Sequence, residues 1–310
     1  MENMIDRTPG ETVKKATSAG LILSGLLRTM RPKQWTKNGF IFAAIVFDRQ
    51  LTHLPALLDT LAGAFLFCLL SSTVYIINDL VDMKADRMHP ERRLRPLASG
   101  QLPVAVALGA VLLLIGLIFP LAFWLSPAFA AICLVYFGLM LAYSFRLKHV
   151  PLVDVLVIAL GFVLRVRAGV MLIEVERFSP WLYVMTTMIA LYLGFGKRRA
   201  ELSLLAGDSG AHRRVLEGYT LPLLDQLITI VSSTTIIAYS LYTFSAPSLP
   251  ENHLMMITIP FVIYSIFRYL YLIQVEHAGG APEDVLLSDR SLQAAILLWG
   301  IAVLTIFYLF

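Results

Sequence analysis

The decisive stretch of this chain runs from an apolar segment, LAGAFLFCLLSSTVYII (61–77), directly into a charged one, NDLVDMKADRMHPERRLRPLASG (78–100). The apolar segment is typical of a membrane-spanning helix. The charged segment places three aspartates, a histidine and five basic residues in a short space. A membrane helix that ends in so many charges predicts a polar site at the membrane surface.

Composition gives the fold class. The chain has 310 residues, of which 58% are hydrophobic and 15% charged, and its mean hydropathy is +0.74. A soluble domain of this length is far less apolar. Repeated apolar runs of about 20 residues are long enough to cross roughly 30 Å of hydrocarbon as helices, and they do not fit a barrel. The sequence therefore predicts an all-α integral membrane protein.

We expect nine transmembrane helices, preceded by a polar tail and a short amphipathic helix near residues 21–29. The tail has no apolar core, so it does not resemble a signal peptide. The chain then divides into a cytoplasmic tail with an interfacial segment (1–30) and a nine-helix transmembrane domain (31–310). The expected spans are 38–56, 59–80, 103–125, 127–145, 151–173, 180–197, 225–245, 253–272 and 291–310.

Basic residues predict the orientation, because Lys and Arg accumulate on the cytoplasmic side of a membrane. Of the 25 Lys and Arg residues, only Arg49 and Arg177 fall clearly on the opposite side of the predicted spans. Arg165 and Arg167 lie inside a span. The sequence thus predicts a multi-pass protein of the inner (plasma) membrane, with its amino terminus inside and its carboxyl terminus outside.

The aspartates at the start of the charged segment form the first candidate site. If the helix continues past Asn78, then Asp79, Asp82 and Asp86 share one face at i, i+3 and i+7. A divalent cation relieves the repulsion between such carboxylates, and oxygen ligands suit Mg²⁺. Asn78 adds a neutral oxygen. The structural alternative is a solvated charged helix end that stops the span.

The basic residues that follow have two interpretations as well. A cluster of arginines recognises anionic groups, but positive charge also sets membrane topology. His89 precedes Pro90 and has no second histidine nearby, so we expect a loop or hydrogen-bonding role for it. The arginines of this cluster are Arg87, Arg92, Arg93 and Arg95.

Two further polar clusters precede predicted spans. RPKQWTKN (31–38) places Gln34, Lys37 and Asn38 on neighbouring helical positions, where they either bind phosphate or belong to an interfacial anchor built around Trp35. YSFRLKHVPLVD (143–154) contains Lys148 on a predicted inner loop, followed by Asp154 in the first turn of the fifth predicted span. Tyr143 either lines the site or is an interfacial tyrosine.

The fifth predicted span contains the least expected charge. Arg165 follows Asp154 by 11 residues, so both project from the same face about 16 Å apart. An arginine at that depth costs at least about 2.5 kcal/mol unless it faces a polar partner or cavity. We therefore expect Arg165 to be functional, and Arg167, on the opposite face, to point outward. Gly161 and Gly169 allow close helix packing.

GKRRAELSLL (196–205) is the last candidate cluster. Lys197 and Arg198 end the sixth predicted span, and Glu201 follows Lys197 by one helical turn. Two adjacent cations with a nearby carboxylate favour binding of an anionic group.

The motif NDLVDMKAD followed by HPERRLRPLASG resembles the first aspartate-rich motif of UbiA-type intramembrane prenyltransferases. This resemblance implies a nine-helix bundle with a magnesium and diphosphate site at the cytoplasmic mouth of a lipid-facing cavity. The common pattern of that family has a second aspartate-rich motif near residues 197–201. This chain has bases there instead, which implies a donor whose extra anionic group is held by cations.

Taken together, the clusters resemble one branch of that family, the decaprenyl-phosphate phosphoribosyltransferases. The further motifs YTLPLLDQL (219–227) and GGAPEDVLLSDR (279–290) belong to the same pattern. The resemblance implies transfer of 5-phosphoribose from phosphoribosyl diphosphate to a polyprenyl phosphate in the synthesis of a lipid-linked arabinose donor for the cell envelope.

The resemblance also assigns roles within the site. On this basis we expect Asp79, Asp82 and Asp86 to be catalytic through Mg²⁺, with Asn78 beside them. Lys197 and Arg198 are the candidates for the 5-phosphate, and Glu201 either meets a ribose hydroxyl or orients Lys197. Lys37, Arg95, Lys148 and Arg165 remain undivided between the lipid phosphate and the diphosphate.

Two alternatives remain open. An aromatic prenyltransferase that uses a polyprenyl diphosphate is the enzymatic one, and a lipid transporter is the other. Transporters often contain repeats and broken helices at mid-membrane, whereas the polar clusters here gather at one mouth. The net charge of +4 implies no nucleic-acid partner, homo-oligomers are left open, and Cys68 and Cys133 are expected to serve packing.

Overall fold

The structure is a computed structural model that describes residues 19–175, 179–205, 214–246, 249–250, 252–276 and 282–309. The expected tail up to residue 18, Arg177, and the pair Gly279 and Gly280 lie outside these residues. The described residues form helices joined by turns, with no strand among them. The predicted all-α class is confirmed.

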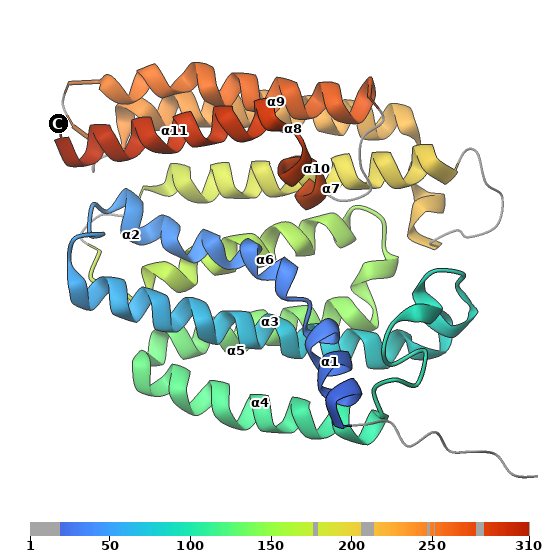
Figure 1. Ribbon diagram of the computed structural model, residues 1–310. Helices are drawn as coiled ribbons and strands as arrows, with labels where there is room; N and C mark the ends of the chain where they lie inside the picture. The colour runs from blue at the N-terminus through green and yellow to red at the C-terminus, as the bar shows by residue number, and fades with distance from the viewer. Residues whose placement is uncertain are drawn as a thin grey trace, which may run out of the picture.

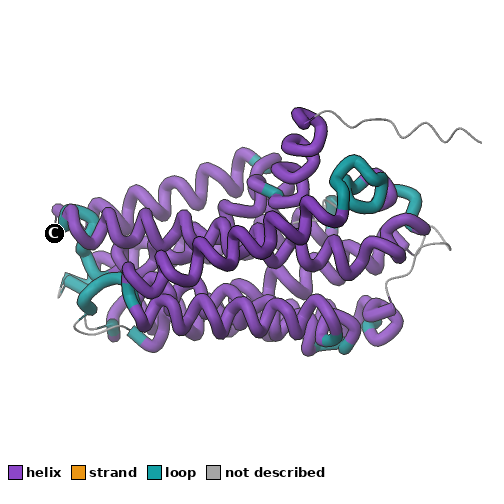
Figure 2. The backbone as a smooth tube through the Cα atoms, turned by 90° about the horizontal axis from the view of Figure 1, so that it is seen from below, coloured by secondary structure: helices purple, strands orange, loops and turns teal. Residues whose placement is uncertain are grey.

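Figure 1 shows the long helices side by side along one common direction, with α1 lying across it. Figure 2 shows from a second side that α1 stands out from the other helices. The helices are α1 (Ala19–Met30), η1 (Pro32–Phe42), α2 (Ala43–Phe47), α3 (Leu54–Met88), η2 (Arg92–Leu94), α4 (Val104–Leu125), α5 (Pro127–Phe145), η3 (Leu147–His149), α6 (Val153–Val170), α7 (Pro180–Leu205), η4 (Arg214–Gly218), α8 (Leu221–Ser245), η5 (Leu254–Thr258), α9 (Ile259–Gln274), α10 (Pro282–Ser288) and α11 (Arg290–Leu309), where η marks 3₁₀ geometry.

Most predicted spans correspond to these helices within a few residues, and local signals explain the agreement. The boundary between α4 and α5 lies at Ser126, whose side chain accepts a hydrogen bond from the Phe129 amide (3.2 Å) and caps α5. α3 continues past Asn78, as the carboxylate argument required, and ends before Pro90. The helix expected near residues 21–29 is α1.

The first predicted span is wrong at both ends. The sequence led us to expect a helix over residues 38–56, but the helical segment begins at Pro32 and ends at Phe47. Pro32 starts the segment because a proline fits the first turn of a helix. The chain then turns through Arg49, which has a left-handed φ of 60°, and α3 begins at Leu54.

Six described helices are long and apolar enough to cross a membrane by length and composition. They are α3, α4, α5, α8, η5 with α9, and α11. The other expected crossings correspond to η1 with α2, α6 and α7. α6 contains Asp154, Arg165 and Arg167, so its composition alone does not mark it as a span, and the number nine remains a prediction.

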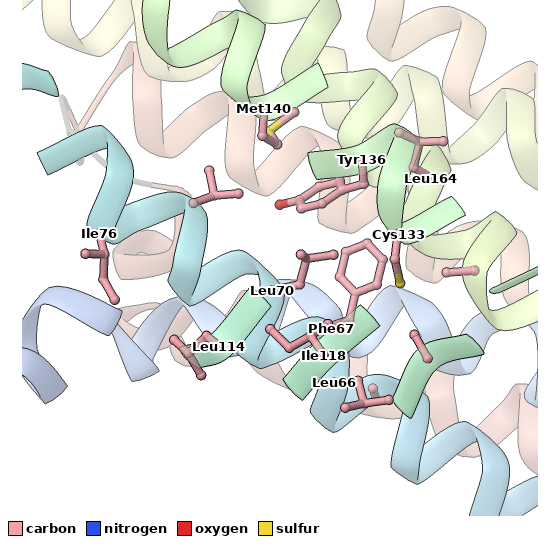
Figure 3. Close-up of a cluster of buried hydrophobic side chains, with 14 of the residues drawn as sticks. Leu66, Phe67, Leu70, Ile76, Leu114, Ile118, Cys133, Tyr136, Met140 and Leu164 are labelled. Carbon is pink, nitrogen blue, oxygen red and sulfur yellow. The ribbon is translucent and has the colours of Figure 1, made fainter. Parts of the chain in front are cut away.

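Apolar side chains divide between the interior and the surface of the bundle. α4 exposes Leu112, Leu113 and Trp124, as expected for a helix that faces lipid. Figure 3 shows the interior between α3, α4, α5 and α6, where Phe67 and Tyr136 stack with ring centroids 4.6 Å apart. Cys133 is buried in this core and Cys68 is partly exposed, and both are free thiols. The packing role expected for Cys133 is confirmed.

The connections alternate between the two ends of the bundle. α3 and α4, α5 and α6, and α7 and α8 are joined at one end, on the right in Figure 1, and the carboxyl end of α11 lies at the other. The charged clusters of the sequence fall on the former end, which we call the site end.

Candidate functional site

The carboxylates of α3 divide into two groups on one helix face. At about 100° per residue, Asp79 and Asp86 project about 20° apart, and Asn78 and Asp82 project about 40° apart beside them. The exposure of these residues follows the same division. Asp79 and Asp86 are each 2% exposed, whereas the Asp82 side chain is 29% exposed.

Asp79 and Asp86 are paired with arginines. Arg95 donates from Nη1 to Asp86 Oδ2 (2.7 Å) and to Asp79 Oδ1 (3.3 Å). Arg31 donates from Nη2 to the same Asp79 oxygen (2.5 Å). Two buried carboxylates on one helix face are thus stabilised by two guanidinium groups, as burial of charge requires.

Asp82 and Asn78 face a lysine instead. Lys148, from η3, donates from Nζ to Asp82 Oδ1 (2.6 Å) and lies 3.4 Å from Asn78 Oδ1. The Asn78 amide in turn donates to Asp82 Oδ2 (3.2 Å). A carboxylate oxygen and an amide oxygen therefore converge on one positively charged group.

This pair of oxygen atoms fits a magnesium site. Mg²⁺ keeps several waters and takes one or two protein oxygens together with substrate phosphates. Within the described part of the chain, no three Asp, Glu, His or Cys side chains lie close enough to hold a metal by themselves. The expected set of three carboxylates is therefore not gathered around one point. Asn78 and Asp82 are the residues that would hold the ion, while Asp79 and Asp86 hold arginines.

Sequence reasoning missed Arg31 as a site residue. Arg31 precedes Pro32 and has a left-handed backbone (φ 54°), which a residue other than glycine rarely adopts. Its guanidinium lies 5.0 Å from the centre of the Tyr75 ring, in addition to its ion pair. Arg31 is the first residue of the cluster RPKQWTKN, so its place in that cluster could have identified it. The helical spacing used for the prediction included only the later residues of the cluster.

The residues predicted from that cluster lie on η1. Gln34 and Lys37 are partly buried on it. Asn38 is buried and points into the bundle, where its amide donates to Cys68 Sγ (3.1 Å) and Ser71 Oγ (3.3 Å). Trp35 Nε1 donates to Ser72 Oγ (2.9 Å) on α3 and so joins η1 to that helix, while the choice between phosphate binding and an interfacial anchor stays a prediction.

Arg165 is buried among neutral partners. It donates from Nε to Asn38 Oδ1 (2.8 Å), from Nη1 to the Gly161 carbonyl (2.9 Å) and from Nη2 to Tyr136 Oη (2.9 Å). Three aromatic rings also lie about its guanidinium, with centroids at 4.9–5.6 Å. Asn38 and Tyr136 are thus the polar partners that an arginine buried within a span requires. Through them Arg165 links η1 and α5 to α6. Arg167 is exposed, as expected for the opposite face.

A second network joins α6 to α7. Asp154 is fully buried at the start of α6, and its Oδ2 accepts from Arg198 Nε (2.7 Å). Arg198 also donates from Nη1 to Glu201 Oε2 (2.6 Å). The guanidinium is therefore placed between two carboxylates, which balance its charge. Lys197 lies beside Arg198 on α7, and Tyr143 of α5 interacts electrostatically with Arg198.

Tyr219 completes this network and was not assigned a role from sequence. Its hydroxyl donates to Asp154 Oδ1 (2.7 Å) and accepts from the Leu152 amide (2.6 Å). Burial, followed by the hydrogen bond to Asp154, raises the pKa of the Tyr219 phenol, so the hydroxyl remains a donor. The Leu152 backbone, at φ 66°, is held in this way next to the segment that carries Lys148.

A hollow of about 570 Å³ lies at the opposite end of the bundle, between α3 and the segment after α6. Charged side chains of both signs line it, including Arg49, Asp59 and Glu174. Arg49 already donates from Nε to the Phe307 carbonyl (2.9 Å). This hollow contains none of the clustered site residues.

Comparison with known proteins identifies the family of this chain. Residues 39–283 match the UbiA prenyltransferase family. The chain is 32% identical, over 99% of its length and 95% of the relative's, to the decaprenyl-phosphate phosphoribosyltransferase of Corynebacterium glutamicum. It is also 32% identical to the protein of the same name from Mycolicibacterium smegmatis, with 90% of this chain and 91% of that one covered.

Solved structures show the same fold. A UbiA homolog from Archaeoglobus fulgidus bound to DMAPP and Mg²⁺ superposes with a TM-score of 0.68, covering 91% of this chain and 99% of that one, at 20% identity. The resemblance read from the sequence motifs is confirmed by these matches. The chain belongs to the UbiA prenyltransferase family.

Proposed function

We propose that the protein transfers 5-phosphoribose from phosphoribosyl diphosphate to a polyprenyl phosphate and releases diphosphate. The product would serve the synthesis of a lipid-linked arabinose donor for the cell envelope. The proposal is supported by near full-length similarity to proteins named decaprenyl-phosphate phosphoribosyltransferase.

One structural observation carries the proposal. The site end joins an oxygen pair that fits Mg²⁺, Asn78 with Asp82, to cations on three other segments, which are Arg31, Arg95 and Lys148. A donor with a diphosphate and a separate phosphate, together with a lipid phosphate, needs this excess of cationic partners near a metal. Lys197 and Arg198 on α7 stand where the common family pattern has a second aspartate-rich motif.

The reaction divides among these groups as follows. Bound Mg²⁺ would neutralise the charge that develops on the leaving diphosphate. Asn78 and Asp82 would hold the ion, while Lys148, Arg95 and Arg31 would bind diphosphate oxygens. Asp79 and Asp86 fix the two arginines. The bond between ribose C1 and the diphosphate oxygen breaks, and its electron pair leaves with diphosphate.

The acceptor attacks C1 from the other face, which inverts its configuration. A phosphate monoester is largely ionised near neutral pH, since its second pKa is about 6, so the lipid phosphate needs no strong general base. Alignment of the two substrates then sets the rate. Lys37 and Tyr143 are candidates for this alignment, and Arg165 would support it by tying η1 to α6.

The 5-phosphate is assigned to the part of α7 that carries Lys197 and Arg198. Lys197 is its proposed direct partner, and the neighbouring Arg198 lies between Asp154 and Glu201. Arg198 would then act with Asp154 mainly to position Glu201, which is 21% exposed and can accept from a ribose hydroxyl. In this assignment the network acts as one rigid unit.

The decisive experiment follows label from ribose-labelled phosphoribosyl diphosphate into solvent-extractable lipid. Purified protein, a polyprenyl phosphate and Mg²⁺ should give labelled lipid, and excess EDTA should abolish the label. Absence of label with several lipid lengths would refute the proposed donor and acceptor.

A polyprenyl diphosphate donor with an aromatic acceptor is the second candidate. The observation in its favour is the shared fold with a homolog bound to DMAPP and Mg²⁺. Transfer of radiolabel from a polyprenyl diphosphate to an aromatic acid, with none from ribose-labelled donor, would establish it. The site end would be cytoplasmic in either case, in a multi-pass protein of the inner membrane.

A further inference from the structure

The Lys148 ammonium occupies a place that a metal ion would take. It lies 2.6 Å from Asp82 Oδ1 and 3.4 Å from Asn78 Oδ1, and these are the two oxygens best suited to Mg²⁺. The lysine and its partners are 66 and 70 residues apart in sequence. Tertiary structure therefore brings this cation to the oxygen pair.

The connection between α5 and α6 holds Lys148 there. The lysine side chain is only 14% exposed. The connection is fastened at its far end, where the Leu152 amide donates to Tyr219 Oη (2.6 Å) and Pro151 packs closely against Gly218. A Cβ on Gly218 would come within 2.2 Å of Pro151 Cγ. These contacts hold the backbone of the connection that carries Lys148.

We propose that Lys148 is an internal competitor of the divalent cation: its ammonium occupies the site between Asn78 and Asp82 until a metal and diphosphate arrive together. The lysine then leaves Asp82 for a diphosphate oxygen, and the ion replaces it. This inference rests on the proposed function for the identity of the diphosphate ligand. The competition itself concerns only the free protein and a metal.

Electrostatics explains why the exchange is coupled to the substrate. An ammonium and a divalent ion repel each other strongly at a distance of a few ångströms, more so in a partly buried site. A metal ion that binds alone must displace Lys148 from Asp82, and the lysine then has no anionic partner, which weakens metal binding. A diphosphate supplies negative charge for both cations, so each ligand raises the affinity for the other, and this coupling is reciprocal.

The other carboxylates of α3 do not exchange in this way. Asp79 and Asp86 are buried and share Arg95, with Arg31 on Asp79. Arginine presents several donors in a fixed plane and holds two carboxylates at once, whereas a lysine is a single mobile charge. Asp82 is therefore the carboxylate of α3 at which a metal ion can replace the basic partner.

Binding of Mn²⁺, without any substrate, tests the competition. Mn²⁺ prefers the same oxygen ligands as Mg²⁺, and the electron paramagnetic resonance signal of the free ion reports its concentration. We expect Lys148→Met to bind Mn²⁺ roughly tenfold more tightly than the wild type, because a unit positive charge is removed from the site. Lys148→Arg keeps the charge and should bind as weakly as the wild type.

Lys84→Met is the matched control. Lys84 lies two residues after Asp82 on α3 but is exposed, so its loss changes the net charge equally and should change Mn²⁺ affinity less than about twofold. Asp82→Asn in the Lys148→Met background should remove the gained affinity. If Lys148→Met binds no more tightly than the wild type, or Lys84→Met gains as much, the proposal is overturned.

Coupling to diphosphate gives a second readout on the wild-type protein. Inorganic diphosphate should raise Mn²⁺ affinity at the protein more in the wild type than in Lys148→Met, after correction for the free complex. Equal enhancement in both would contradict the exchange. Neither measurement uses a phosphoribosyl donor or a lipid, so a failed transfer assay would refute the proposed function and leave this inference standing.

Discussion

Each carboxylate at the end of α3 has a basic partner outside that helix. The Asp79, Asp86 and Asp82 side chains meet Arg31, Arg95 and Lys148. The basic partners balance the charge on this helix face, so the repulsion expected between the three carboxylates is relieved. The same carboxylates differ in exposure, and this difference is the basis for proposing Asp82 as the metal ligand and the two buried aspartates as partners of arginines.

Asp82→Ala should lower phosphoribosyl transfer by about two orders of magnitude or more, because the substrate's metal loses its charged ligand. Thermal stability should change little, since Asp82 and Lys148 both retain some contact with solvent. The assay is lipid labelling combined with thermal unfolding in detergent. Asp59→Ala, on the same helix at the far end, is the control and should keep its activity. A near-normal rate in Asp82→Ala would remove the metal proposal.

Asp154→Ala should destabilise the protein by about 3 kcal/mol or more, because it removes one of the two carboxylates that balance the buried Arg198 and leaves the Tyr219 hydroxyl without its acceptor. Asp225→Ala is the contrast, since Asp225 pairs with Arg199 but is 39% exposed. Its loss should cost about 1 kcal/mol or less. Chemical unfolding of both variants measures the difference. Equal effects would show that the Asp154 network is not a structural unit.

At the scale of elements, close approach decides how α6 sits in the bundle. α6 packs against η1, α5 and α7, and Gly169 allows the contact with η1. A Cβ at this position would come within 2.0 Å of the Ile41 carbonyl oxygen. The packing role expected for this glycine is confirmed, and the contact joins the carboxyl end of η1 to the carboxyl end of α6.

Gly169→Ala should therefore be strongly destabilising, because backbone must move to admit the methyl group. Gly138→Ala on α5 is the matched control. No atom lies within 4 Å of its added Cβ, and alanine favours a helix by roughly 0.5–1 kcal/mol over glycine. Thermal unfolding should show opposite signs for the two variants. A neutral Gly169→Ala would mean that η1 is not fastened here.

Asp289 links α9 to α11 and gives a prediction about pH. Its Oδ1 accepts from the Leu292 amide (2.7 Å) as a helix cap, and Arg268 donates from Nη2 to its Oδ2 (2.7 Å). The hydrogen bond from Arg268 lowers the pKa of Asp289 below its usual value of 3.8. The stability gained from this ionised group is present above the unfolded-state pKa, and it is lost as pH falls through the lower folded-state pKa.

Asp289→Asn keeps an acceptor for the cap and loses the charge, so it should be less stable than the wild type at neutral pH. The difference should shrink as pH falls through about 4 and below, where the wild-type carboxyl gains a proton. Unfolding of both proteins across pH 3–7 (about the range set by these pKa values) measures it. A difference that is constant with pH would show that the ion pair adds no stability.

At the scale of the whole molecule, the two ends of the bundle differ in charge. The site end carries the bases on the connections after α3 and α5 and in the carboxyl half of α7. Arg49, an apparent exception at the far end, is bonded to the Phe307 carbonyl and lies over the Phe307 ring. Because the Arg49 guanidinium is engaged with Phe307, this arginine does not argue against a cytoplasmic site end.

Cysteine labelling tests this orientation. In a background of Cys68→Ser and Cys133→Ala, Glu91→Cys at the site end should react with an impermeant maleimide only after the membrane is opened. Asn252→Cys, exposed at the far end, should react in intact cells. The opposite pattern would invert the proposed topology and place the site outside.

The sequence by itself determined the helical class, the family, most helix bounds and the stretch that carries the site. These properties depend on apolar run length, prolines and residue order, which act within a few residues. Only the tertiary structure decided which base meets which acid. Arg31 and Asp79, Lys148 and Asp82, and Arg198 and Asp154 are 44–66 residues apart, and such pairings depend on how helices pack, which local periodicity does not encode.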